Sequence, residues 1–142
     1  MKKNNIKIVS ILVVAFFCAG CQFFREKIPV KIGSKIYHLE VAHSPSLQKK
    51  GLSGRKKLQA DQGMLFVFKK EGRRSFWMKD THFPLQMIFL DQNKKIREIF
   101  LAPLCSDDFC EIYFFDNTKY VIEVLGSEKL TVKKGDQILF EL

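Results

Sequence analysis

Side chains of complementary chemistry gather in and around FWMKDTHFPLQMIFL, residues 76–90, a stretch that contains the only tryptophan of the chain. An aromatic face beside amide, hydroxyl, carboxylate and cationic groups suits a small polar ligand such as a sugar. The ring stacks against the sugar, and the polar side chains fix its hydroxyls. The candidate ligand-binding residues are Arg55, Trp77, Lys79, Asp80, Thr81, Gln86 and Glu123.

The same residues admit two other interpretations. An acid–base enzyme would use Asp80 or Glu123 together with Lys79, given suitably shifted pKa values. In a purely structural interpretation, Trp77 packs in the core and Lys79 pairs with Asp80 or another acid. Glu123 then accepts hydrogen bonds from Arg55, and breaking such a buried pair on one side costs several kcal/mol.

Several enzyme signatures are missing from the sequence. It has no glycine-rich phosphate loop, no zinc-binding pair of histidines on a helix and no nucleophile elbow. His38, His43 and His82 stand alone, and their spacing does not indicate a metal site. We therefore predict neither a metal nor a cofactor, and no catalytic residue is assigned.

Residues 1–20 have the features of a secretion signal, because a lysine-rich start precedes a short apolar run over residues 8–19. That run is well short of the roughly 20 residues that span a bilayer as a helix. It ends in FCAGC, which resembles the lipobox of bacterial lipoproteins, whose cysteine is lipidated and begins the mature chain. We expect lipid attachment at Cys21; an ordinary cleaved signal and an uncleaved anchor are the alternatives.

Lipidation at Cys21 would hold the protein in the cell envelope, on a membrane surface facing outside the cytoplasm, such as the periplasm. Residues 21–29 are then expected to form a tether. Residues 30–142 are long enough for one domain with a core of its own, and we expect a monomer.

The chain carries a formal net charge of +9, with basic residues concentrated at 49–57 and 69–74. Such clusters suit anionic lipid headgroups beside the anchor. They also suit nucleic acid, a partner that we do not expect outside the cytoplasm. Solvated loops are the simpler interpretation of both clusters.

Cys105 and Cys110 remain as an even pair in LCSDDFC once Cys18 is removed with the signal and Cys21 is assigned to lipid. Outside the cytoplasm such a pair favours a disulfide. The spacing differs from the C-x-x-C of redox enzymes, and a zinc site would need two further ligands. We therefore predict a structural disulfide.

Short apolar segments separated by turn residues predict the secondary structure. A hairpin is expected over residues 30–41, and a short helix between Ser44, a capping residue, and Gly51, a residue that ends helices. Further strands are expected at 63–68, 75–79, 85–90, 96–102, 119–125 and 137–142, with a charged turn at 69–74. The fold class predicted is a mainly β, antiparallel domain, barrel-like or a sandwich, with one or two short helices.

Five stretches carry a resemblance to a known family. They are GLSGRKKL (51–58), DQGMLFVF (61–68), FWMKDTHFPLQMIFL (76–90), KYVIEVLG (119–126) and KKGD (133–136). In this order and with these gaps the chain resembles the DUF192 domain family of bacteria and archaea over residues 30–142. The resemblance implies a predominantly β fold and no established reaction.

Two positions depart from the pattern of that family. Gln86 stands where the family usually has aspartate, and Asp80 where it often has asparagine. A family mechanism that needs a carboxylate at position 86 would not be available to this chain.

The leading functional hypothesis is a membrane-anchored, non-enzymatic domain that binds a small polar ligand, such as a carbohydrate, or an envelope protein. One alternative is a small acid–base hydrolase or transferase acting on a cell-envelope substrate. Another is an accessory protein of envelope assembly. An open cleft beside Trp77 without an aligned nucleophile–base pair would favour the first.

Overall fold

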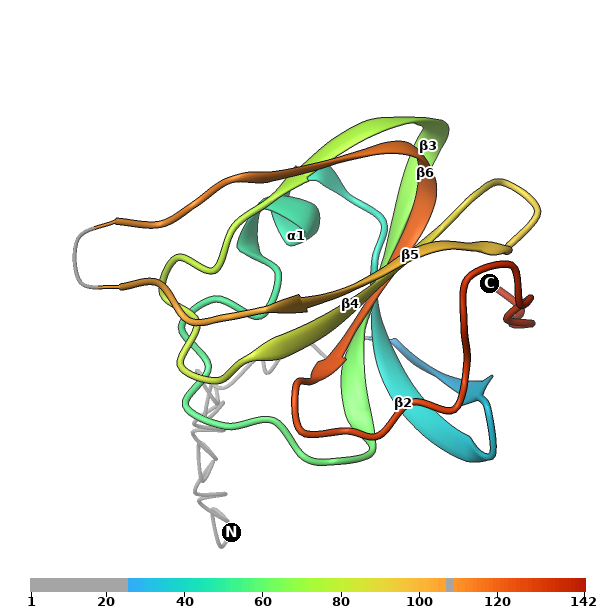
Figure 1. Cartoon of the computed structure of the whole chain (residues 1–142), viewed down its shortest axis with the longest axis horizontal. Helices are drawn as coiled ribbons and strands as arrows, with labels where there is room; N and C mark the ends of the chain where they lie inside the picture. Colours follow the sequence, from blue (N-terminus) through green and yellow to red (C-terminus); the bar gives the residue numbers. More distant parts are fainter. Residues whose placement is uncertain (1–25, 107–108) are drawn as a thin grey trace, which may run out of the picture.

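The computed structural model describes residues 26–106 and 109–142, which form one six-stranded sheet and one short helix (Figure 1). The expected signal peptide and Cys21 lie outside the described residues. The elements are β1 (Lys27–Ile32), β2 (Lys35–Ala42), α1 (Pro45–Lys50), β3 (Gln62–Phe76), β4 (Leu85–Leu90), β5 (Ile96–Ala102) and β6 (Tyr113–Leu125). β1 begins at Lys27, inside the stretch that was expected to be a tether.

The strand order is β1-β2-β3-β6-β4-β5, and every neighbouring pair is antiparallel except β2 and β3, which run parallel. The prediction of a mainly β, largely antiparallel domain is therefore confirmed. The sheet does not close into a barrel, because β1 and β5 remain as its two edges. The parallel pair requires a crossover, and α1 and the loop that follows it supply the connection.

Two apolar cores lie on opposite faces of the sheet, because successive side chains of a strand point to opposite sides. β6 shows the division: Ile122 and Val124 belong to one core, and Val121 to the other. Ile138 and Phe140, from the C-terminal segment, pack into the first core. The second core includes Leu52 and Leu58 from the loop after α1.

Residues 68–76 of β3 and 113–119 of β6 form a two-stranded arm that folds over β4 and β5 (Figure 1). Ring contacts hold it there: Phe115 of β6 stacks on Phe89 of β4 with centroids 3.6 Å apart, and Tyr113 lies 4.5 Å from Phe100 of β5. This second layer makes the domain sandwich-like.

The helix forms as its sequence predicts. The Ser44 side chain accepts a hydrogen bond from the Leu47 amide at 3.3 Å, and Pro45 occupies the first turn, where its missing N–H costs nothing. Gly51, at φ 51°, ends the helix and donates its N–H to the Leu47 carbonyl. No helix of the described residues is long and apolar enough to cross a membrane.

Three expectations about strands are wrong. No separate strand covers residues 75–79, because β3 continues to Phe76 and residues 77–79 lie outside every strand. Residues 69–74 are not a turn but the middle of β3, where the pairing with β6 shifts register around Gly72. The arm exposes much of this stretch to solvent, so its charged composition resembles that of a turn. Residues 137–142 form an isolated bridge between Gln137 and Lys95 but no strand. Hydrogen bonds to residues 93–95 and the packing of two apolar side chains into the first core hold this segment.

We predict that Gly63→Ala destabilises the fold by about 1–3 kcal/mol, the usual cost of overpacking. A Cβ at Gly63 would lie 2.2 Å from the carbonyl oxygen of Glu123 and 2.8 Å from a Leu39 methyl. Gly72→Ala in the same strand is the control: only the Arg74 guanidinium comes within 4 Å, at 3.8 Å, so a change within about 0.5 kcal/mol is expected. Urea denaturation followed by circular dichroism measures both; equal losses would contradict the packing argument.

Candidate functional site

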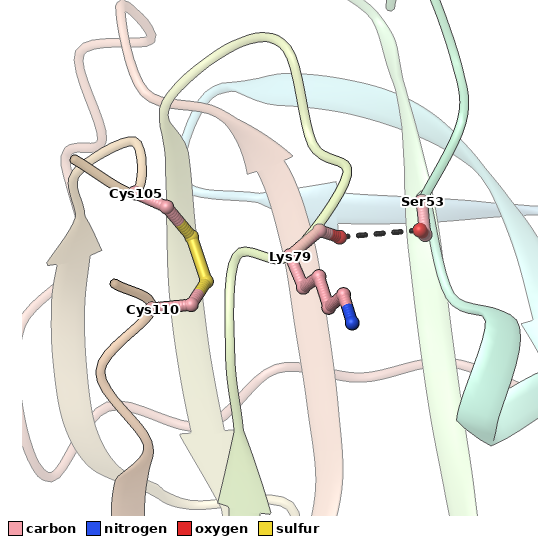
Figure 2. Close-up of a disulfide and its surroundings, with 4 residues drawn as sticks. All are labelled: Ser53, Lys79, Cys105 and Cys110. Atoms are coloured by element: carbon pink, nitrogen blue, oxygen red, sulfur yellow. Dashed lines mark hydrogen bonds between the residues drawn. A yellow bond between two sulfur atoms is a disulfide. The ribbon is translucent and has the colours of Figure 1, made fainter. Parts of the chain in front are cut away.

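Two loops meet above the second core and are joined by hydrogen bonds. The Ser53 hydroxyl donates to the Lys79 carbonyl at 3.1 Å (Figure 2), and the Gly54 amide donates to the Asp80 carbonyl at 2.7 Å. Asp80 has φ 55°, a left-handed conformation in which aspartate and asparagine are enriched. The backbone conformation therefore explains why this chain can have aspartate at position 80 where the family often has asparagine, and the explanation requires no catalytic role for Asp80.

The predicted disulfide is present beside these loops. Cys105 and Cys110 are bonded, with Cα atoms 4.8 Å apart (Figure 2). Both cysteines pack against the second core, which includes Met78. The pair therefore supports the wall of the region that holds residues 77–81.

A cavity of about 330 Å³ lies between α1, β3 and the turn after β3. Its volume is at the lower end of the range for small-molecule sites. Aromatic walls come from Phe66, Phe68, Phe76 and Trp77. Polar and charged side chains come from Gln48, Lys49, Lys50, Ser53, Ser75, Lys79, Thr81 and Glu123.

Four of the seven candidate residues line this cavity: Trp77, Lys79, Thr81 and Glu123. Gln86 does not, because it lies on the opposite face of the sheet, paired with Val124 of the first core. Its amide donates to the carbonyls of Gly126 and Glu128 and so fixes the chain after β6. A carboxylate at position 86 would therefore not reach the cavity.

Trp77 and Lys79 do not have the roles that a purely structural interpretation gives them, namely a core ring and a lysine paired with an acid. Trp77 is not a core residue, since 48% of it is exposed. Among the described residues no carboxylate pairs with Lys79; its ammonium group lies 5.6 Å from the centre of the Trp77 ring, within the range of a cation–π contact. Both side chains are therefore available at the cavity.

A row of side chains crosses the sheet beneath the cavity: Glu40 of β2, Met64 of β3, Glu123 of β6 and Met87 of β4 lie side by side. Both carboxyl groups belong to buried residues, with Glu40 8% and Glu123 4% exposed. Two acids on one apolar face are costly unless they are paired or neutralised.

Arg55 pairs with Glu40, whereas the structural interpretation of the sequence paired it with Glu123. Its two terminal nitrogens donate to the two Glu40 oxygens at 2.7 and 2.6 Å, a bidentate geometry that favours strong pairing. The importance of Glu40 was missed. Its place in an alternating strand suggested no partner, and only the path of the loop after α1 brings Arg55 to it.

Glu123 keeps its carboxyl group without a hydrogen bond or ion pair among the described residues. Burial raises its pKa from 4.5 to about 8, and the positive charge of Arg55 opposes this rise only in part. Glu123 is therefore mostly protonated at neutral pH. In this state it supplies the floor of the cavity with one O–H donor.

Within residues 26–106 and 109–142, no group of three or more His, Cys, Asp or Glu side chains is placed to hold a metal ion. His38 instead lies 3.7 Å from Asp61 on the surface. The cavity combines ring faces, lysines and one buried acid, an arrangement suited to an organic molecule.

These features are those of a sandwich-like β domain with a small polar–aromatic cavity at one end of its central strands. The model of the DUF192 family, described as "Uncharacterized ACR", matches residues 28–140. The chain belongs to this family, as its sequence motifs predicted. No curated protein matches the sequence.

Two solved structures share the fold. A protein of Sinorhizobium meliloti 1021, described provisionally as a transcription regulator, is 30% identical with a TM-score of 0.69, over 81% of this chain and 92% of its own. A protein of unknown function from Novosphingobium aromaticivorans DSM 12444 is 26% identical with a TM-score of 0.68, over 80% and 84% of the two chains.

We predict that the free energy of unfolding decreases as the pH rises from 4.5 towards 8. The folded state holds the Glu123 proton more tightly than the unfolded state, so this contribution is complete below pH 4.5 and is lost as the pH passes the folded pKa of about 8. The slope approaches about 1.4 kcal/mol per pH unit within this window. Urea denaturation at successive pH values measures it.

Glu123→Gln is the matched control, because the amide has nearly the same shape and does not ionise. The variant should lose this part of the pH dependence and be more stable than the natural protein at pH 8. The same slope in both proteins would show that Glu123 ionises normally in the folded state.

Proposed function

We propose that this protein is a lipoprotein of the cell envelope, anchored through Cys21, whose β domain binds a small polar ligand of the size and shape of a sugar. The observation that carries the binding proposal is the half-exposed Trp77 ring at a cavity of about 330 Å³. A ring with one face at an open cavity suits stacking against a flat or chair-shaped molecule. The lipobox-like sequence before Cys21 carries the proposal of an anchor.

The polar groups around the cavity support a ligand with hydroxyl groups. Thr81 offers a hydroxyl that donates and accepts, Ser53 and Gln48 offer oxygens that accept, and Glu123 lies on the floor. Ser53 and Gln48 already bond to backbone carbonyls, Ser53 to Lys79 at 3.1 Å and Gln48 to Val67 at 2.8 Å. Their positions are thus preorganised before a ligand arrives, which lowers the entropic cost of binding.

Acid–base catalysis is the second candidate, and the buried Glu123 favours it. A carboxyl group with a pKa raised to about 8 is suited to give a proton at neutral pH. Against it, no hydrogen bond joins a nucleophile to a base among the described side chains that line the cavity. A hydrolytic activity that Glu123→Gln abolishes while ligand binding persists would favour catalysis over binding alone.

We predict that a sugar that enters the cavity shifts the fluorescence of Trp77 saturably, since this is the only tryptophan. Trp77→Ala should weaken binding about threefold to tenfold in calorimetry, as expected from the loss of one stacked ring. Phe114→Ala is the control, because this exposed ring lies over Arg73 and does not line the cavity. Equal effects of the two substitutions would exclude a site at Trp77.

We predict that Cys21→Ala abolishes acylation and releases the protein from membranes. Two or more acyl chains anchor a protein firmly to a membrane, and a protein without the acylated cysteine lacks this anchor. Labelling with a palmitate analogue and fractionation of cell membranes measure the effect, with Cys105→Ala as the control that keeps the lipid site. Membrane retention of the Cys21→Ala protein at the natural level would contradict the lipid anchor.

A further inference from the structure

The charges at the cavity are strongly unequal. Lys49 and Lys50 belong to the last turn of α1, Lys79 belongs to the turn after β3, and all three are exposed. We call these three residues the lysine rim. Glu123 is the only acidic side chain among the described residues that line the cavity. A ligand entering the cavity therefore meets an excess of positive charge at the mouth.

The single acid does not cancel this excess. Glu123 is 4% exposed and lies on the floor, and the guanidinium nearest to it, on Arg55, is already engaged by both oxygens of Glu40. An acid held without a partner in an apolar setting retains its proton and is neutral. The floor thus presents a hydrogen-bond donor, and the lysine rim presents cations.

Resting on the proposed function, we propose that the cavity is specific for an anionic sugar, a ring compound that carries a carboxylate or a phosphate. The anionic group binds the lysine rim, the ring lies against Trp77, and an oxygen of the ligand accepts a hydrogen bond from Glu123. Charge-assisted hydrogen bonds from lysine make the first of these contacts the strongest. A cationic sugar is disfavoured by the same three lysines.

Isothermal titration of the full-length protein in detergent micelles tests this assignment with four small ligands: D-glucuronate, glucose 6-phosphate, D-glucose and D-glucosamine. The two anionic sugars should bind about tenfold or more tightly than glucose, the difference expected for at least one charge-assisted contact, and glucosamine should bind more weakly than glucose. The two anionic sugars also distinguish a carboxylate site from a phosphate site.

Lys79→Gln should weaken the binding of the anionic sugars about fivefold more than it weakens the binding of glucose, because only the anionic group makes a charge-assisted contact with the ammonium group. Lys134→Gln is the control, because Lys134 is exposed, lies 3.7 Å from Glu98 and does not line the cavity. If both substitutions weaken the anionic sugars equally, the effect comes from net charge, and the lysine rim is not the binding site.

The affinity for D-glucuronate should fall about tenfold between pH 6.5 and pH 9, as Glu123 loses its proton and repels the anion. The charged groups around Glu123 are Arg55, paired with Glu40, and the lysine rim. Glu123→Gln isolates the role of Glu123 from theirs and should flatten the dependence. A decrease of the same size in that variant would contradict the contact between Glu123 and the ligand.

The outcomes separate this inference from the proposed function. If glucose and glucosamine bind as tightly as glucuronate and shift the Trp77 emission, the cavity binds sugars and only the anionic specificity is wrong. If none of the four ligands binds, the proposed sugar-binding function fails together with the inference.

Discussion

The bidentate ion pair between Arg55 and Glu40 determines where the loop after α1 lies, and the cavity depends on that position. Arg55 follows directly after Ser53 and Gly54, whose hydrogen bonds hold the turn at Lys79 and Asp80. A buried charge pair is weak as a source of net stability, but it is costly to break on one side. It therefore favours one position of the loop over others that would bury the same apolar area.

The same pair leaves Glu123 as the second acid of the row with no guanidinium of its own. Because Glu123 has no cationic partner of its own in the apolar core, burial raises the pKa of its carboxyl group and favours the protonated form. The floor of the cavity is therefore a neutral donor beneath a cationic mouth. This polarity arises because, in the described part of the chain, one arginine lies near two buried acids and pairs with only one of them.

The departures from the family pattern have separate physical meanings. Gln86 lies on the face of the sheet away from the cavity, where its amide ties the chain after β6. Asp80 occupies a left-handed position that asparagine also tolerates. Neither change alters the side chains that line the cavity, so a binding role for the cavity does not depend on the carboxylate that this chain lacks at position 86.

Local patterns were sufficient for the helix at Pro45–Lys50, the first hairpin and the disulfide, because each depends on neighbours in sequence. Composition misled at residues 69–74, where charged side chains cover an exposed strand. Arg55 lies in the loop that connects β2 to β3, and the path of this loop decides which acid it reaches. No local sequence pattern therefore distinguishes Glu40 from Glu123 as its partner. The sequence alone thus determined the fold class and the residue types near Trp77. The tertiary structure decided which acid is paired, which acid is protonated and which side chains share a cavity. The reason is that burial and long-range contacts set the energies of charged groups.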